Sequence, residues 1–281
     1  MHLIDGRALA DRLTEQLRQS LDQTSSHPTL AILLVGNDPA SDLYVRLKQK
    51  AAADVGIRVV LERREATTPD HELIDLIEDW NKDSMIDSIL VQFPLPPNHD
   101  EDRVMAAVDP KKDVDGFHPK NVESLLQGQL TIVPPVHRGI LRLLNETPHK
   151  INGSFVVLIV NGDLFARPLQ RLLETAGASV TVMQPDDLNK TTLSEADVVI
   201  IAVGRPNFLH ASMVKADAVI IDVGTTKIAD KTRGDVDLNS FEKTDAWITP
   251  VPGGVGPMTI IELLNNVTAA HLSNPSIAPT A

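Results

Sequence analysis

The sequence predicts an α/β protein of two domains, each built on a largely parallel β-sheet. Short, unbroken apolar runs such as Leu30–Val35 recur at intervals of roughly 20 to 30 residues, with helical patterns between them. Aromatic residues make up only 3% of the chain, so the core must consist of Ala, Val, Ile and Leu, which suits parallel strands covered by helices. A length of 281 residues accommodates one large or two ordinary domains.

The amino-terminal half alternates strands and helices. Apolar residues at helical spacing predict a first helix, and later segments open at Pro or Asp residues that favour helix starts. The stretch 109–126 contains so many Asp, Gly and Pro residues that we predict no regular structure there. The predicted helices are Ala8–Leu21, Asp70–Asn81 and Asp102–Ala107, and the predicted strands are Leu30–Val35, Arg58–Glu65 and Ser88–Phe93.

A helix follows the first strand and carries Tyr44 and Lys48 on one face, because residues four apart are neighbours on a helix. Ser41 or Asp42 is expected to cap this helix, which should end at Gly56. The pair lies beside the carboxyl end of a predicted parallel strand, where ligands bind in open α/β sheets. A Tyr and a Lys at this spacing are usually structural. The strand-turn-helix context and the presence of a single tyrosine in the chain favour acid-base chemistry by a lysine of lowered pKa.

Further polar residues follow later strands. Gln92 interrupts an apolar strand at its carboxyl end, either as a structurally paired amide or as part of a site at the same edge as Lys48. Asp113 and Asp115 either form Asx turns or present a carboxylate to a ligand with a row of N–H donors. The Asp-x-Asp-Gly string lacks the other oxygen ligands of a calcium loop, so we predict no metal site.

The carboxyl-terminal half has the pattern of a Rossmann-like domain, with a dinucleotide expected at the turn after its first strand. That turn, 161–168, contains one glycine, Gly162, and no G-x-G-x-x-G. The segment 248–259 is rich in Pro and Gly and predicts a rigid loop that forms the wall of a binding cleft. The expected helices are 138–145, 168–177 and 260–270, and the expected strands are 154–160, 178–183, 197–203 and 218–223.

The overall charge bounds the class of partner. A net charge of −12 and a pI near 5.1 argue against nucleic acid or an anionic membrane as a main partner. The chain has no cysteine, no apolar run long enough to span a membrane and no secretory h-region, so a cytoplasmic location is expected.

Several long strings occur in the order of a known family. They are VGNDPASDLYVRLKQKAAADVGI, ILVQFPLP, PKKDVDGFHPKN, AVGRPNF, IDVGTT, GDVDL and TPVPGGVGPMT. On these strings the chain resembles, from end to end, the bifunctional methylenetetrahydrofolate dehydrogenase/methenyltetrahydrofolate cyclohydrolases, called FolD in bacteria. The resemblance implies a cytoplasmic homodimer that acts on tetrahydrofolate derivatives with NADP in one-carbon metabolism and purine biosynthesis. It also implies a folate-binding catalytic domain over 1–137 plus a final helix at about 260–281, and a dinucleotide-binding domain over 138–259.

The resemblance assigns roles to individual residues. Lys48 would be the catalytic lysine of the cyclohydrolase step, with Tyr44 lining the pocket and Gln92 tuning the lysine. Asp115 would grip the pterin, and the loop that contains Pro252, Gly253 and Gly254 would close over the aromatic tail of the folate. The residues at the cofactor positions are Asn161, Gly162, Asp163 and Thr225.

The departures from the family pattern surround the dinucleotide site. The chain reads PPVHRG over 134–139 in place of PCTPxG, VNGDLFARP over 160–168 in place of GRSxxVGxP, and Met-Gln-Pro over 183–185 in place of Cys-His-Ser. Asp163 now stands where a phosphate is expected, although Arg167 or Arg205 could serve that phosphate instead. Three alternatives follow: an enzyme with both activities, an enzyme with the cyclohydrolase activity alone, and a non-catalytic folate-binding homologue.

Overall fold

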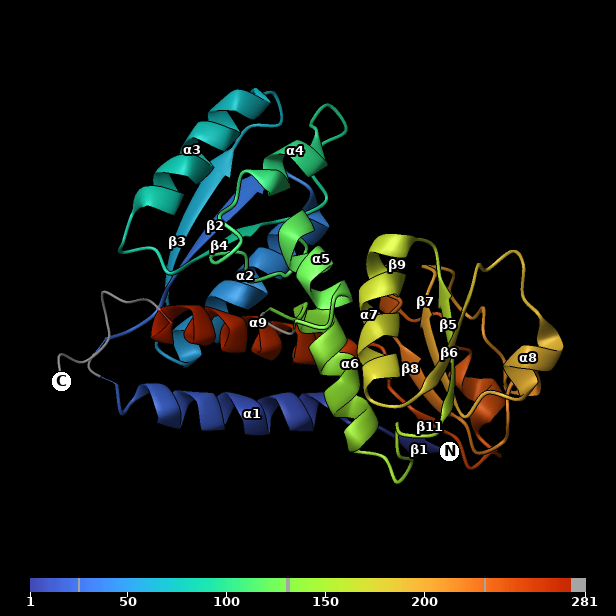
Figure 1. Ribbon diagram of the computed structural model, residues 1–281. Helices are drawn as coiled ribbons and strands as arrows, with labels where there is room; N and C mark the ends of the chain where they lie inside the picture. The colour runs from blue at the N-terminus through green and yellow to red at the C-terminus, as the bar shows by residue number, and fades with distance from the viewer. Residues whose placement is uncertain (25, 130–131, 230, 274–281) are drawn as a thin grey trace. The chain divides into compact units, whose positions relative to one another are not determined.

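A computed structural model describes residues 1–24, 26–129, 132–229 and 231–273 and divides the chain into two compact α/β units (Figure 1). The predicted fold class, two α/β domains with parallel sheets, is confirmed. Each unit combines several separate segments of the chain. The three-stranded unit comprises Arg12–Ser124, Leu130–Pro135 and Ile260–Ala281, and the six-stranded unit comprises Met1–Asp11, Leu125–Gln129 and Val136–Thr259.

The three-stranded unit has a parallel sheet in the order β3-β2-β4. Its central strand β2 is buried along its whole length, because Ala31, Leu33 and Val35 pack with the apolar face of α3 and α2 packs against β2 and β3. The strands are β2 (Thr29–Val35), β3 (Arg58–Arg64) and β4 (Ser88–Val91), and the helices are α2 (Pro39–Asp54), α3 (Asp70–Lys82) and α4 (Glu101–Ala106).

Helix α2 begins earlier than its predicted cap. Asp38 is the N-cap and its carboxylate accepts a hydrogen bond from the Ser41 amide at 2.7 Å, so the expectation of a cap at Ser41 or Asp42 was wrong. Pro39 explains the difference, since proline is favoured at the first helical position, where its missing N–H costs nothing. The buried face of α2 consists of Ser41, Val45, Lys48 and Ala52.

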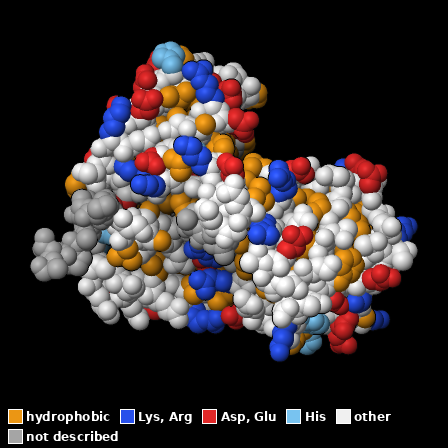
Figure 2. All heavy atoms as spheres, in the orientation of Figure 1, with side chains coloured by type: hydrophobic (Ala, Val, Ile, Leu, Met, Phe, Trp, Pro, Cys, Tyr) orange, Lys and Arg blue, Asp and Glu red, His pale blue; other side chains and the backbone are white. Residues whose placement is uncertain are grey.

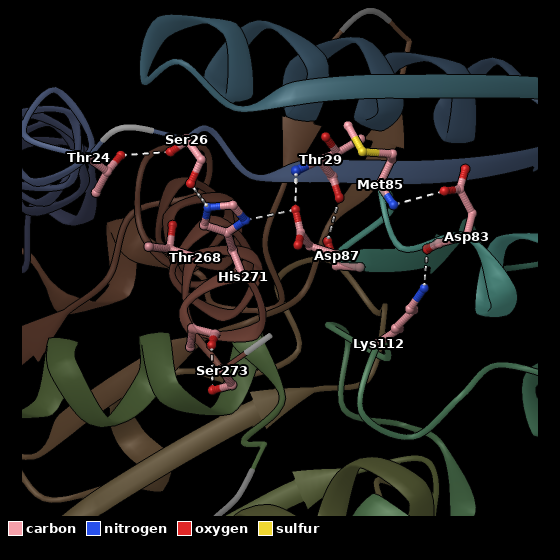
Figure 3. A network of polar contacts seen from close by, with 12 residues as sticks. Thr24, Ser26, Thr29, Asp83, Met85, Asp87, Lys112, Thr268, His271 and Ser273 are labelled. Atoms are coloured by element: carbon pink, nitrogen blue, oxygen red, sulfur yellow. Dashed lines mark hydrogen bonds and ion pairs between the residues drawn. The ribbon is translucent and has the colours of Figure 1, made fainter. Parts of the chain in front are cut away.

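The last helix, α9 (Val255–Leu272), is anchored near its carboxyl end within the three-stranded unit (Figure 3). The imidazole of His271 lies with Nδ1 2.9 Å from Asp87 Oδ2 and with Nε2 3.0 Å from Ser26 Oγ. Asp87 Oδ2 also accepts a hydrogen bond from the Thr29 amide at 2.8 Å, at the start of β2. The end of α9 is therefore fixed to the amino-terminal edge of the sheet.

The six-stranded unit has a parallel sheet in the order β1-β11-β8-β7-β5-β6. Its core is mainly aliphatic, with Phe241 as a fully buried aromatic residue, and α7 packs against β5 and β6. The sheet strands are β1 (His2–Leu3), β5 (Phe155–Val160), β6 (Ser179–Met183), β7 (Val198–Ala202), β8 (Val219–Asp222) and β11 (Trp247–Ile248), and a separate hairpin pairs β9 (Thr226–Ile228) with β10 (Lys231–Arg233). The helices are α6 (Pro135–Asn145), α7 (Asp163–Thr175), α8 (Lys190–Ser194) and two 3₁₀ turns at Ala211–Met213 and Leu238–Phe241.

Among the described helices, α1 (Gly6–Leu21), α5 (Pro119–Leu126), α6 and α9 have residues in both units. The prediction that residues 1–137 form one domain was wrong for the amino terminus, because β1 pairs with β11 of the six-stranded sheet. Helix α5 forms where no regular structure was predicted. Pro119, placed as its first residue, matches the preference of proline for helix starts and was not weighed in the prediction.

Two other helices start earlier than predicted. Helix α7 begins at Asp163 and contains Pro168, which had been taken as its first residue. Helix α9 begins at Val255, so its first turn includes part of the segment predicted as a loop over 248–259. In both cases Gly and Pro residues were read as breakers. Proline is accommodated near the start of α9, where few backbone hydrogen bonds are lost, whereas Pro168 lies inside α7 and removes one backbone donor there.

Candidate active site

Lys48 is a buried lysine on the inner face of α2, with only 8% of its surface exposed. Burial lowers the pKa of its ammonium group, because the charged form loses solvation, and the negative charge of Asp115 opposes this shift. Its Nζ donates a hydrogen bond to Gln92 Oε1 at 3.0 Å. A lowered pKa makes the neutral amine, the form that accepts a proton, more readily available than in an exposed lysine.

Gln92 follows β4 directly and extends the sheet, since its amide donates to the Leu33 carbonyl at 2.9 Å. Its side-chain Nε2 donates to the Phe93 carbonyl at 2.7 Å. That bond fixes the orientation of the amide, because only the nitrogen can donate to a carbonyl, and so directs Oε1 toward Lys48. The predicted proximity of Gln92 and Lys48 at one sheet edge is present in the structure.

Asp113 and Asp115 take different positions in the loop before α5. Asp113 is buried, and its carboxylate accepts hydrogen bonds from the amides of Asp115, Gly116 and His118 and from Asn121 Nδ2, at 2.9 to 3.2 Å. It therefore organises the loop, as expected of an Asx-type turn.

In the part of the chain that the structure describes, no group of three or more His, Asp and Glu side chains could hold a metal ion.

The Asp115 carboxylate interacts electrostatically with Lys48. Burial raises the pKa of Asp115, the charge of Lys48 lowers it, and the neighbouring charge of Asp113 raises it. Lys48, Gln92 and Asp115 thus form one polar cluster at the carboxyl edge of the three-stranded sheet. Burial pushes both ionisable members toward their neutral forms.

Tyr44 lies one turn before Lys48 on α2, and 38% of its surface is exposed. Its neighbours Leu43 and Leu47 are also exposed, at 56% and 41%. The two residues predicted to share a helix face therefore differ in exposure: the lysine is buried and the phenol is accessible to a ligand. A phenol in this position can contact a bound molecule without being part of the core.

Pro252, Gly253 and Gly254 belong to the six-stranded unit, in the turn before α9. The backbone packs tightly there: a Cβ atom on Gly254 would lie 2.7 Å from the Pro250 carbonyl oxygen. A Cβ atom on Gly6 would lie 2.1 Å from the Gly254 oxygen. The rigidity predicted for this loop thus comes from close backbone contacts that only glycine permits.

The turn after β5 contains Asn161, Gly162 and Asp163, the predicted cofactor residues. Gly162 is the N-cap of α7 and forms no side-chain cap, and space around its Cβ direction is open within 4 Å. Backbone N–H groups without a side-chain cap, and free space beside Gly162, would allow a phosphate to bind at this helix start. The exposed carboxylate of Asp163 in the first helical turn opposes one, and Asn161 Nδ2 is engaged with the Val203 carbonyl at 3.0 Å. The backbone of the turn fits a dinucleotide phosphate, whereas its side chains do not.

Of the two arginines that could serve a phosphate at this turn, Arg205 is engaged with another side chain. Arg205 forms an ion pair with Asp186, with Nη1 2.5 Å from Oδ1, and lies over the Phe208 ring. Arg167 is exposed on α7, and Thr225 is exposed just after β8. Arg205 is therefore held by Asp186, whereas Arg167 lies four residues after Asp163, one turn further along α7.

Two buried carboxyl groups at the carboxyl edge of the six-stranded sheet were not singled out from the sequence. Asp235 Oδ2 accepts the amides of Val203 and Gly204 at 2.7 and 3.1 Å, and Asp222 accepts those of Gly224, Asp235 and Val236 at 2.9 to 3.0 Å. Burial, with a contribution from the Asp235 charge, raises the pKa of Asp222 to about 6. Their sequence signal was an Asp at or after a strand end beside Gly, in IDVGTT and GDVDL.

His137, one of the departures from the family pattern, is completely buried in the six-stranded unit. Its ring meets the Phe165 ring edge to face, with 4.7 Å between centroids. Burial lowers its pKa to about 3, and a hydrogen bond with the Phe165 backbone opposes that shift. His137 is therefore neutral at physiological pH and packs against the first turn of α7.

Comparison with known proteins identifies the family. Residues 4–115 match the catalytic domain of tetrahydrofolate dehydrogenase/cyclohydrolase, and residues 134–274 match the NAD(P)-binding domain of the same enzymes. The chain belongs to the tetrahydrofolate dehydrogenase/cyclohydrolase family. The polar cluster lies within or at the end of the catalytic-domain match, since it consists of Lys48, Gln92 and Asp115.

Individual members of the family agree over almost the whole chain. Bifunctional protein FolD 2 of Pseudomonas syringae pv. syringae is 44% identical over 279 residues, covering 96% of this chain and 93% of the relative. The crystal structure of FolD from Campylobacter jejuni is similar with a TM-score of 0.91 and 36% identity, covering 96% of this chain and 98% of that one. FolD of Trypanosoma brucei, solved with NADP and an inhibitor, has a TM-score of 0.90 and 32% identity, covering 95% and 96% of the two chains.

The surface carries side chains of both charges. On the face shown in Figure 2, acidic and basic side chains are interspersed and apolar side chains form small groups between them. Among the described residues, none of the helices combines the length and apolar character that a membrane span needs.

Proposed function

We propose that this protein hydrolyses 5,10-methenyltetrahydrofolate to 10-formyltetrahydrofolate, with Lys48 as the catalytic residue. The observation that carries the proposal is the buried amine of Lys48, held 3.0 Å from Gln92 Oε1 and facing the charge of Asp115. A protein that only binds folate has no need of an amine whose pKa is lowered by burial. The cluster therefore favours the catalytic reading over a non-catalytic homologue.

In this mechanism, water adds to the electrophilic methenyl carbon between N5 and N10 of the substrate. The neutral amine of Lys48 accepts a proton from the attacking water as the new C–O bond forms. The bond from that carbon to N5 then breaks as N5 receives a proton from the Lys48 ammonium. The hydroxyl group on the carbon loses its proton to water, and the carbon remains on N10 as a formyl group. The substrate is a cation and the product is neutral, so one proton is released overall.

Gln92 and Asp115 have supporting roles in the proposal. The amide oxygen of Gln92 orients the Lys48 amine, and the Asp115 carboxylate accepts hydrogen bonds from the N–H groups of the pterin ring. Tyr44 is accessible enough to contact the substrate. Roles for Pro252, Gly253 and Gly254 toward the substrate, and for Asn161, Gly162, Asp163 and Thr225 toward a cofactor, remain predictions from the resemblance.

NADP-dependent oxidation of 5,10-methylenetetrahydrofolate is the second candidate activity, favoured by the match of residues 134–274 to an NAD(P)-binding domain. NADP would supply a hydride acceptor. The carboxylate of Asp163 at the start of α7 opposes a phosphate there, so hydrolysis is the activity that the described residues support best. The wider expectations of a homodimer, a cytoplasmic location and a role in purine biosynthesis belong to the same proposal.

The test is the decay of methenyltetrahydrofolate, followed with and without NADP. Lys48→Met should lower the rate by roughly 10²- to 10⁴-fold, the usual contribution of a positioned acid-base group. Lys50→Met is the matched control, because Lys50 lies on the same helix, is exposed and pairs with Asp54 at 2.6 Å. The proposal is wrong if the wild-type protein does not accelerate the decay of the substrate above its rate in buffer alone. It is also wrong if Lys48→Met keeps full activity.

A further inference from the structure

Asn266 is a buried polar residue of α9, and only 6% of its surface is exposed. Its neighbours on the helix include Ile261, Leu263, Leu264 and Val267, each with no more than 2% of its surface exposed. A buried amide costs free energy unless its hydrogen bonds are made. Its partners therefore indicate why an amide occupies this position.

The Asn266 side chain bridges two loop segments through one nitrogen. Nδ2 donates to the Val114 carbonyl at 2.9 Å and to the Val133 carbonyl at 3.0 Å, which uses both of its protons. Val114 immediately precedes Asp115. The same two segments also meet at Gly116, where a Cβ atom would lie 3.0 Å from the Pro134 nitrogen.

The helix that carries Asn266 is itself fixed. Five residues further along α9, His271 lies 2.9 Å from Asp87 and 3.0 Å from Ser26, as Figure 3 shows. Asp113 holds the Asp115 loop from the other side, through the amides of Asp115 and Gly116. The backbone around Asp115 is therefore held both by its own loop and by α9.

We propose that Asn266 is a positioning residue for Asp115, holding the Val114 backbone so that the carboxylate faces both Lys48 and the substrate. The inference rests on the proposed function, because it assumes that Asp115 binds the substrate. Asn266 does not touch the reacting atoms and acts only through the loop. Its loss should therefore weaken substrate binding more than it slows the chemical step.

Asn266→Leu removes both donors at nearly constant volume. We expect kcat/KM for methenyltetrahydrofolate to fall about tenfold, chiefly through a higher KM, since a buried hydrogen-bonding partner is lost. Thr268→Val is the matched control: Thr268 lies on the same helix with 7% exposure, and its hydroxyl bonds only locally, to the Leu264 carbonyl at 2.9 Å. That control should change kcat/KM less than about twofold.

A double-mutant cycle with Asp115→Asn separates positioning from a general effect on the fold. If Asn266 acts through Asp115, adding Asn266→Leu to Asp115→Asn should lower kcat/KM less than about twofold further. An unchanged kcat/KM in Asn266→Leu, or a full tenfold loss that persists beside Asp115→Asn, overturns the inference. If Asn266→Leu does not fold, Asn266→Ser carries the same cycle. An active Lys48→Met variant would instead overturn the proposed function, so the two failures are distinguishable.

Discussion

The predicted catalytic residues Lys48 and Gln92 of the three-stranded unit are buried, whereas the predicted cofactor residues at the turn after β5 in the six-stranded unit are exposed. At the carboxyl edge of the three-stranded sheet, Lys48 and Gln92 are each 8% exposed, bonded to each other and subject to the charge of Asp115. At the turn after β5 in the six-stranded sheet, Asn161, Gly162 and Asp163 are exposed. Burial changes the proton affinity of an ionisable side chain, so we assign the acid-base chemistry to the first edge. The exposed charges of the turn after β5 interact through solvent and are weakened by screening.

The largest expected effect is at His137, a buried ionisable group in the six-stranded unit, where the predicted cofactor residues are exposed. Its pKa falls from 6.5 to about 3 in the folded protein, so the unfolded chain binds more protons between those values. Stability conferred by the neutral ring is complete above pH 6.5 and is lost as the pH falls toward 3, by at most about 5 kcal/mol.

The measurement is the free energy of unfolding in denaturant at a series of pH values, for the wild type and for His137→Leu. The difference between the two curves should change across this window, with the wild type losing stability faster on acidification. Carboxylates contribute equally to both curves and so cancel. Parallel curves would mean that burial does not hold the His137 ring neutral.

Gln92 tests whether the buried edge works as a unit. Gln92→Leu removes the acceptor of the Lys48 amine, and we expect kcat for methenyltetrahydrofolate hydrolysis to fall about 10- to 100-fold. Gln92→Glu instead places a negative charge near the amine, which raises the pKa of Lys48 and should shift the rising limb of the pH–rate profile to higher pH. Gln49→Leu on α2 serves as the control. Identical pH profiles for the wild type and Gln92→Glu would mean that residue 92 does not influence the pKa of Lys48.

The smallest expected effect lies at the exposed edge. Asp163→Asn removes a negative charge from the first turn of α7, and Asp186→Asn releases Arg205 from its ion pair. Each should tighten NADP binding by roughly two- to fivefold at low salt, as exposed charges typically do. Titration calorimetry measures this, with Asp217→Asn as the control, since Asp217 is exposed just before the amino end of β8. Micromolar binding by the wild type, unchanged in both variants, would contradict the assignment of Asp163 as an obstacle.

The sequence predicted what depends on local pattern. The parallel strands were visible as apolar runs, and Lys48 and Gln92 could be placed at one edge because each follows a strand. The helix start at Pro39 and the whole of α5 were missed, because the preference of proline for a first helical turn was not weighed at Pro39 and Pro119.

The remaining errors concern contacts between distant segments. Nothing near Asn266 in the sequence indicates that its partners are the carbonyls of Val114 and Val133, 152 and 133 residues away. The pairing of β1 with β11 joins residues at opposite ends of the chain for the same reason. A polar residue inside an apolar helix was the one signal available for Asn266, and it indicates a partner without saying which.

The assembly of each unit from separate segments has a practical consequence for dissecting the protein. A fragment cut at the predicted limits, 138–259, lacks β1, so β11 becomes an unpaired edge strand that is open to aggregation. A fragment ending near residue 137 lacks the part of α9 that contains Asn266 and His271, and with it the donor to Val114 and the partner of Asp87. Neither half of this chain can be excised as one continuous piece, so studies of a single activity have to silence the other by point substitution in the intact polypeptide.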